Sequence, residues 1–271
     1  MPSIVTWTRR HRLAAFFGLT FFVSWWSWPL QALDLTPNAH WPWGPLVAAL
    51  VVIGVTEGRS GYRTLGARMI RWRVGWQWWL VALGTPLALL AVASFANVAI
   101  WGAPAPVLAS MGWSAIALVF AIRIVNPLDG PLGEEPGWRG YALPQLQARR
   151  SPLASTAILG VFVALWHLPL VVTGQLFAFG LVVTFFITFV YSWLFNHTGG
   201  SVLMTMLFHI AQGTVTYAAL GFTGADAARM DWITGVLWCA LAVVLVVVDR
   251  KAWRTAPASA IADRPADHAL L

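Results

Sequence analysis

The sequence predicts an all-α polytopic membrane protein with about eight transmembrane helices, in the range seven to eight. Of its 271 residues, 59% are hydrophobic and only 10% are charged, and the mean hydropathy is +0.70. Soluble domains carry charge on roughly a quarter of their residues, so this composition excludes an ordinary soluble protein. The single cysteine, Cys239, excludes an internal disulfide and a zinc site built on several thiolates.

Eight apolar segments account for this composition, and each predicts one helix in the bilayer. A hydrocarbon core of ~30 Å needs about 20 helical residues, so the second and fourth segments are short for a full span. The first segment follows three arginines, as a signal peptide would, but it is long and lacks a small-x-small cleavage site, which predicts an uncleaved helix. The segments are residues 13–33, 43–56, 77–101, 112–127, 153–173, 177–195, 201–221 and 232–248.

The basic residues fall almost entirely on one side of this topology. Fifteen arginines and lysines lie on one face, whereas Arg229 lies on the other and Arg123 lies inside a span. Because cytoplasmic loops collect Lys and Arg, this asymmetry predicts that both termini are cytoplasmic. The net charge of +7 is therefore a topology signal, and no nucleic-acid partner is expected. The fifteen residues are Arg9, Arg10, Arg12, Arg59, Arg63, Arg68, Arg71, Arg73, Arg139, Arg149, Arg150, Arg250, Lys251, Arg254 and Arg264.

The chain is expected to form one membrane domain with a cytoplasmic segment at each end. Residues 59–75 place arginines among Leu65, Met69 and Trp72. That pattern is typical of a basic amphipathic helix on the inner membrane surface, and equally of a positive loop that holds the topology. The expected parts are a cytoplasmic N-terminus at 1–12, N-terminal transmembrane helices at 13–111, a core at 112–221, a last transmembrane helix at 222–248 and a disordered cytoplasmic tail at 249–271.

Two adjacent glutamates stand out in this apolar chain. Glu134 and Glu135 are followed by Arg139 within the segment 133–140, GEEPGWRG. Ionisable groups at membrane depth cost roughly 2.5–3.5 kcal/mol each on insertion scales, so they usually face a polar interior and carry function. Arg139 is four residues after Glu135, which is the spacing of an ion pair on one helix face. The alternative is a solvated cytoplasmic cap that contains only a salt bridge.

The local sequence predicts where the glutamate helix begins. Residues 129–131, Asp-Gly-Pro, are typical of a turn, and Pro136 suits the first turn of a helix, where its missing N–H is not needed. We therefore expect a helix from about Glu135 to Gln147. Both glutamates would then lie at its N-terminus, where the helix dipole favours negative charge by roughly 0.3–1 kcal/mol. One carboxylate would pair with the arginine, and the other would be free to accept a proton.

Two histidines lie in apolar stretches downstream, His167 late in the fifth segment and His209 in the seventh. A lone histidine in an apolar helix is more often a packing residue than a ligand. Two of them in a chain with paired glutamates favour a polar cluster, because buried polar groups must find partners. The topology separates the glutamates from His167 in depth, so a cluster requires a tilted or broken helix, and Pro169 is suited to end one. The remaining histidines are expected in termini, loops or turns: His11, His40, His197 and His268.

The glutamates and histidines resemble the motifs of the CPBP family of intramembrane proteases. That family includes the CaaX-processing prenyl endopeptidases and the Abi-type bacteriocin self-immunity proteins. Its first motif, Glu-Glu-x-x-x-Arg, is matched in full by Glu134, Glu135 and Arg139. The resemblance covers roughly residues 112–221, and the first motif with two correctly placed histidines is fairly specific.

The second and third motifs are matched with one departure each. Phe-x-x-x-His is matched at His167, although valine replaces the phenylalanine. His-x-x-x-Asn is matched at His209, but Gly213 replaces the asparagine. Loss of one oxyanion donor can lower turnover by on the order of 10²–10³, so this departure bears on activity. Gln212 and Thr214 are polar neighbours without the spacing of the motif.

The resemblance implies a role for each matched residue. Glu134 would activate a water as general base with the help of His167. Glu135 and Arg139 would orient the site, and His209 would stabilise the oxyanion of the attacked amide. A metal is also an open question, because Glu134, His167 and His209 are candidate ligands that could hold zinc with one open position.

These observations lead to the hypothesis of a bacterial inner-membrane, multi-pass endopeptidase that hydrolyses a peptide bond of a membrane-associated or lipidated peptide. The alternative is a non-catalytic bacteriocin-immunity or scaffold protein of the same fold, which the glycine at 213 favours. A proton-coupled transporter has less support, since no inverted pair of interrupted helices is visible. The expected partners are a peptide or lipidated protein substrate and the lipid bilayer. The substrate, the cleavage rule and the oligomeric state are left open.

Overall fold

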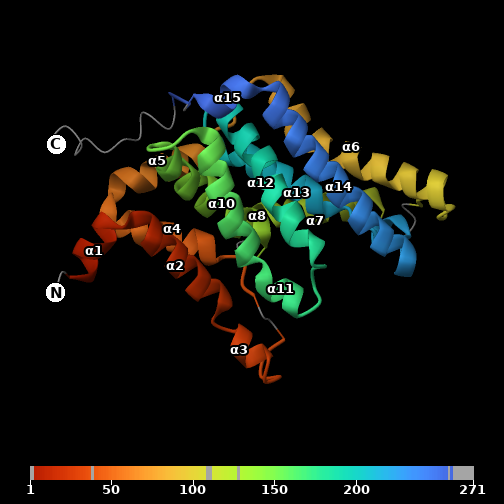
Figure 1. Cartoon of the computed structure of the whole chain (residues 1–271), viewed down its shortest axis with the longest axis horizontal. Coiled ribbons are helices and arrows are strands. Elements are labelled where there is room, and N and C mark those ends of the chain that lie inside the picture. Colours follow the sequence, from red (N-terminus) through yellow and green to blue (C-terminus); the bar gives the residue numbers. More distant parts are fainter. Residues whose placement is uncertain (1–2, 38–39, 108–111, 127–128, 256, 259–271) are drawn as a thin grey trace.

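The computed structural model describes residues 3–37, 40–107, 112–126, 129–255 and 257–258, and within these ranges the chain is helical without strands. The elements form one bundle (Figure 1). In chain order they are α1 (Ile4–Arg10), α2 (Arg12–Trp25), α3 (Trp28–Gln31), α4 (Gly44–Thr56), α5 (Arg59–Met69), α6 (Trp76–Trp101), α7 (Trp113–Val125), α8 (Gly130–Gly137), the π-helical turn η2 (Trp138–Ala142), α9 (Leu143–Gln147), α10 (Pro152–Trp166), α11 (Leu168–Val172), α12 (Phe179–His197), α13 (Val202–Thr214), the 3₁₀ turn η3 (Ala218–Leu220), α14 (Gly224–Val248) and α15 (Arg250–Arg254).

Every predicted apolar segment contains a helix. Among the described residues, five helical runs are long and apolar enough to cross a membrane, and α4, α10 and α13 are shorter apolar helices. The fold class is therefore confirmed as all-helical and consistent with a polytopic membrane protein. The number of spans and the cytoplasmic placement of both termini stay predictions. The five runs are Arg12–Gln31, Trp76–Trp101, Trp113–Gln147, Phe179–His197 and Gly224–Val248.

Two apolar clusters hold the bundle together. In the first, α2, α4 and the α8–α10 region meet around Phe16, Trp138 and Trp166, which are all fully buried. In the second, α6, α12, α13 and α14 meet around Phe208 and Trp238. The helix α13 contacts α6, α7, α8 and α12, so it connects the two clusters. The glutamate and histidine motifs therefore lie at the centre of the packing.

The glutamate helix begins earlier than the sequence predicts. Asp129 is the N-cap of α8, where its side chain accepts from the Gly130 N–H at 2.8 Å, and Pro131 takes the first turn in place of Pro136. The glutamates consequently lie in the second turn rather than at the helix N-terminus. Pro136 is inside the helix, where it cannot donate a backbone hydrogen bond, and the chain continues as the π-helical turn η2. Single π turns inside helices are frequent at functional sites.

The predicted disorder of residues 249–271 is wrong for the start of that tail. Residues 250–254 form α15, because Trp253 is 3% exposed and packs against Phe189 with ring centroids 5.7 Å apart. Its indole N–H also donates to the Leu245 carbonyl at 3.0 Å. Most of the remaining tail lies outside the described residues.

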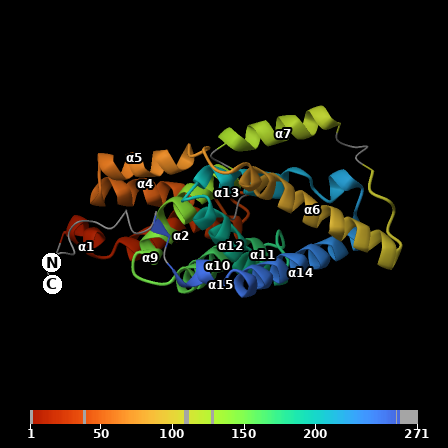
Figure 2. The same cartoon turned by 90° about the horizontal axis from the view of Figure 1, so that it is seen from above.

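The basic segment 59–75 forms a helix only over its first part, α5. Its Leu65 is buried, whereas Tyr62 and Arg63 are exposed, as an amphipathic surface helix requires. The helix α7 has a different position, at the edge of the bundle (Figure 2). Its residues are at most partly buried, and it contacts α13 and α8. Any side chain that reaches from α7 to the motif helices therefore comes from outside the core.

Candidate active site

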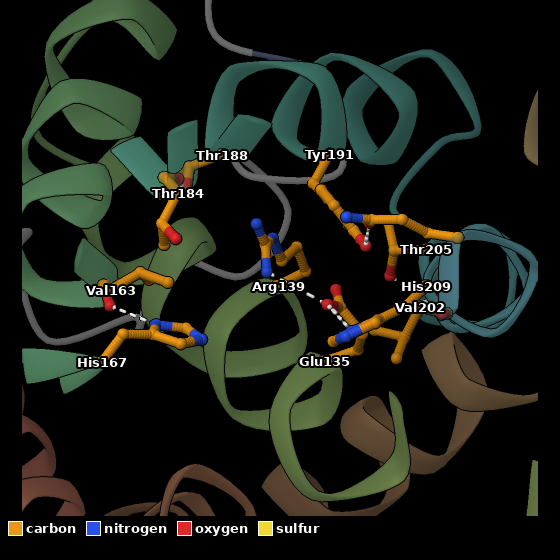
Figure 3. A network of polar contacts seen from close by, with 11 residues as sticks. Glu135, Arg139, Val163, His167, Thr184, Thr188, Tyr191, Val202, Thr205 and His209 are labelled. Atoms are coloured by element: carbon orange, nitrogen blue, oxygen red, sulfur yellow. Dashed lines mark hydrogen bonds and ion pairs between the residues drawn. The ribbon is translucent and has the colours of Figure 1, made fainter. Parts of the chain in front are cut away.

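Glu135 is the centre of the polar cluster. Its Oε1 accepts a hydrogen bond from Arg139 Nη1 at 3.1 Å and another from His209 Nδ1 at 3.1 Å (Figure 3). Glu135 is fully buried and Arg139 is 3% exposed, so the alternative of a solvated cap is wrong. An ionised carboxylate accepts only, and Nδ1 of His209 is therefore the protonated ring nitrogen of this bond. The contact fixes the imidazole so that Nε2 points away from Glu135.

The Glu134 carboxylate and the His209 imidazole both lie close to Gly130. A Cβ at position 130 would lie 2.7 Å from Oε1 of Glu134 and 3.1 Å from Nε2 of His209. A side chain at position 130 would therefore collide with the Glu134 carboxylate and crowd the imidazole, so glycine allows both groups to approach the same point. Glu134 is 8% exposed, and its carboxylate is within electrostatic reach of His209, Glu135 and Arg139.

An aromatic ring completes the surroundings of Arg139. The guanidinium lies over the ring of Tyr191, with Cζ 4.3 Å from the ring centroid, which is a cation–π contact. The hydroxyl of Tyr191 donates to Oε1 of Gln212 at 2.6 Å. Tyr191 comes from α12 and Gln212 from α13, so this chain of contacts joins both helices to the π-helical turn. Arg139 is thereby held by a carboxylate and an aromatic face.

His167 lies at a break between two helices, as the sequence argument about Pro169 required. The helix α10 ends at Trp166, His167 is its C-cap, and α11 begins at Leu168. Nδ1 of His167 bonds the Val163 carbonyl at 2.8 Å, so Nε2 is the ring nitrogen that can meet a substrate or water. Within the described residues His167 makes no direct contact with either glutamate. Figure 3 shows Arg139 between His167 and the Glu135–His209 pair.

A cavity of about 450 Å³ connects His167 to the third motif. His167, Gln212 and Gly213 line it, together with apolar side chains such as Ile187 and Trp238. Pockets that bind small molecules and peptides are mostly apolar with a few placed polar groups. In this cavity apolar side chains alternate with polar ones, among them Thr184, Asp231 and Thr234, and the cavity borders the second and third motifs.

The three candidate zinc ligands, Glu134, His167 and His209, do not converge in the structure. In the part of the chain that the structure describes, no three His, Cys, Asp or Glu side chains converge as the ligands of one metal ion. Glu134 and His209 share a space, but His167 stands apart from them. The set Glu134, His167 and His209 therefore does not fit a zinc site in this arrangement, and no step below depends on a metal.

Sequence reasoning missed several residues that the structure adds to the site. His40 lies in the loop before α4, as expected, but it also packs on Trp166 and His167, with ring centroids 4.0 and 6.1 Å away. The sequence identifies Arg123 only as a charge inside a span. In the structure its Nη1 donates to the carbonyl of Gly213 in α13 at 2.7 Å. An isolated arginine in an apolar segment was the available signal, because such a residue must find a polar partner.

Comparisons with known proteins cover the part of the chain that carries this cluster. Residues 112–215 match the family model described as type II CAAX prenyl endopeptidase, Rce1-like. A curated relative, CAAX prenyl protease 2 of Methanococcus maripaludis, is 28% identical over 130 residues, which cover 44% of this chain and 46% of the relative. The alignment thus spans about half the length of that relative. The matched region contains all three motifs, and the family model and the relative both support the resemblance to the CPBP family that those motifs predicted.

Proposed function

We propose that this protein is an intramembrane endopeptidase of the CAAX prenyl endopeptidase type. The observation that carries the proposal is the approach of the Glu134 carboxylate and of Nε2 of His209 to the same point beside Gly130. A base and an oxyanion donor on two sides of a scissile carbonyl are what amide hydrolysis requires. The family match over residues 112–215 supports the same reaction.

In the proposed mechanism Glu134 takes a proton from a water molecule. The oxygen of that water attacks the carbonyl carbon of the scissile amide, and the C=O electron pair moves onto oxygen. His209, protonated on both nitrogens beside the Glu135 carboxylate, donates from Nε2 to the oxyanion. Glu134 then gives its proton to the amide nitrogen, the C–N bond breaks and the oxyanion returns to a carbonyl.

The remaining motif residues position this pair. Glu135 holds the imidazole by its Nδ1, and Arg139 balances the charge of Glu135 in a buried setting, where an unpaired carboxylate would be costly. His167 borders the cavity and contributes an Nε2 toward the bound peptide or the attacking water. The site thus has one reactive carboxylate and one orienting carboxylate.

The substrate class follows from the cavity and from the family. A cavity of about 450 Å³, lined in part by apolar side chains such as Ile187 and Trp238, supports a hydrophobic or lipidated peptide as substrate. The curated relative is named a CAAX prenyl protease, so a prenylated CAAX peptide is the first substrate to test here. A multi-pass protein in the bacterial inner membrane is the setting that we propose, with the bilayer supplying the lipidated substrate.

The test compares wild type with Glu134→Gln in the same membranes. We expect new peptide termini, identified by mass spectrometry, only with wild type, and cleavage of a prenylated CAAX peptide by the purified wild-type protein alone. Asp34→Asn is the matched control, because Asp34 is exposed and has a φ of 56° that asparagine tolerates. Identical termini and no cleavage by folded wild type would overturn the protease and favour the non-catalytic immunity or scaffold protein.

A further inference from the structure

Arg123 lies where the third motif departs from its family pattern. It is in the last turn of α7, and its Nη1 donates to the carbonyl of Gly213 at 2.7 Å. Its Nε lies 3.0 Å from Oδ2 of Asp129, the N-cap of the glutamate helix. The guanidinium therefore joins the third-motif helix to the start of the first-motif helix. Gly213 is four residues after His209, which is the position of the motif asparagine.

The guanidinium occupies the space that a side chain at position 213 would need. A Cβ built on Gly213 would lie 2.6 Å from Nη1, 2.8 Å from Nη2 and 3.0 Å from Cζ of Arg123. Contacts below 3.0 Å force one group to move. Arg123 and a side chain at 213 therefore compete for one volume. A glycine at position 213 is therefore what allows the guanidinium of Arg123 to lie here.

Arg123 is also placed to act on the reacting groups. It interacts electrostatically with His209 and Tyr191. Gly213, against which it packs, lines the cavity that His167 also borders. An arginine has five N–H donors and always carries its charge. Here Nη1 donates one hydrogen bond to Gly213, and the guanidinium forms an ion pair with Asp129 through Nε. A cation with N–H groups at this position can stabilise negative charge that develops beside His209.

The other polar groups near position 213 are otherwise engaged. Thr214 Oγ1 donates to the Ile210 carbonyl at 2.6 Å, and the side-chain Oε1 of Gln212 accepts from the Tyr191 hydroxyl at 2.6 Å. The threonine hydroxyl is thus committed to its own helix, and the glutamine is turned toward Tyr191. Neither residue places a cation at position 213, where the motif has asparagine, whereas Arg123 does.

We propose that Arg123 takes the place of the motif asparagine and supplies a cationic N–H donor on the oxyanion side of the site. This inference rests on the proposed protease function. It assigns to α7 a functional side chain at a position outside the three motifs. It also explains how the chain keeps an oxyanion donor although residue 213 is glycine.

The test uses four purified proteins: wild type, Arg123→Ala, Gly213→Asn and the double variant. Against a prenylated CAAX peptide, Arg123→Ala should lower kcat by on the order of 10²–10³ and change KM little, because an oxyanion donor acts in the transition state. Gly213→Asn alone should also lose activity, since the new side chain displaces the guanidinium. The double variant should recover at least about tenfold over Arg123→Ala, because the asparagine then occupies the vacated space.

Melting temperatures of the same four proteins give a readout that does not depend on cleavage. Gly213→Asn should melt below wild type, and the double variant should melt above Gly213→Asn, because the clash is removed. If Arg123→Ala folds poorly, Arg123→Lys serves in its place. Lysine keeps the charge, so this variant should retain part of the wild-type kcat. Arg63→Ala, on the exposed face of α5, is the matched arginine control and should behave as wild type.

The outcomes separate this inference from the proposed function. If folded wild type cleaves nothing, the protease proposal fails and the inference fails with it. If wild type cleaves and folded Arg123→Ala cleaves equally well, only the inference is overturned. If Arg123→Ala is inactive and the folded double variant recovers nothing, Arg123 is a structural tie between two helices and the oxyanion assignment is wrong.

Discussion

His209 donates its Nδ1–H to Oε1 of Glu135 at 3.1 Å, across 74 residues of sequence. The contact joins α13 to α8 and uses the same carboxylate oxygen that Arg139 contacts. A histidine held in this way presents its Nε2 on the side where Glu134 approaches Gly130. The orientation of the proposed oxyanion donor therefore depends on Glu135, to which the proposed mechanism assigns no proton transfer.

Replacement of Glu135 by glutamine should damage both stability and activity. The change leaves Arg139 without its buried counter-charge, and breaking one partner of a buried pair costs about 3–5 kcal/mol. We expect a lower melting temperature and loss of cleavage, whereas Glu134→Gln should lose cleavage while melting near wild type. Thermal unfolding in detergent and a peptide assay measure both effects. A stable and active Glu135→Gln protein would contradict the assigned positioning role.

Gly130→Ala should abolish the proposed cleavage by displacing the Glu134 carboxylate from its position near His209. The added methyl group would lie 2.7 Å from the Glu134 oxygen, so the carboxylate must move. Displacements of this size can cost on the order of 10²-fold in rate. Gly84→Ala is the matched control, because a Cβ there meets nothing within 4 Å. Equal kcat values for the two variants would show that the position of the Glu134 carboxylate beside Gly130 does not matter for the reaction.

Two substitutions at Tyr191 should separate its ring from its hydroxyl. Tyr191→Phe keeps the aromatic face under Arg139 and loses only the hydrogen bond to Gln212, which is worth about 0.5–1.5 kcal/mol. Tyr191→Leu removes the ring and with it a cation–π contact worth roughly 2 kcal/mol when desolvated. We expect the phenylalanine variant to melt closer to wild type and to keep more activity. The opposite order would assign the importance of Tyr191 to its hydroxyl.

His40 should make the fold sensitive to acid. Burial, followed by the nearby charge of His167, lowers the pKa of His40 to about 3. The unfolded chain takes up this proton near a pKa of 6.5, whereas the folded protein does so only near 3. Lowering the pH through that range therefore favours the unfolded state.

The measurement is the melting temperature of wild type and His40→Phe between pH 7 and pH 4. Wild type should lose more stability than the variant over this range, because phenylalanine keeps the packing on Trp166 but has no proton to bind. Parallel pH dependence in both proteins would show that His40 does not carry the effect.

The sequence determined the features that depend on composition and on short spacing. The apolar segments predicted the helices, because 59% hydrophobic residues in runs of this length have no other stable arrangement in a bilayer. The Glu135–Arg139 pair followed from helix geometry, since residues four apart lie on one face. The break between two helices at His167 was expected from Pro169. The start of the glutamate helix was missed, because Asp129 and Pro131 compete with Pro136 for the first turn.

Tertiary structure alone decided which of these groups meet. The contact of His209 with Glu135 joins α13 to α8, and no local pattern contains the distance between two helices. The separation of His167 from the glutamates depends on the angle at a helix break. Arg123 fills the position vacated at Gly213 because α7 packs beside α13. Short-range spacing selects the residues of a site, whereas packing between distant helices selects the partner of each residue.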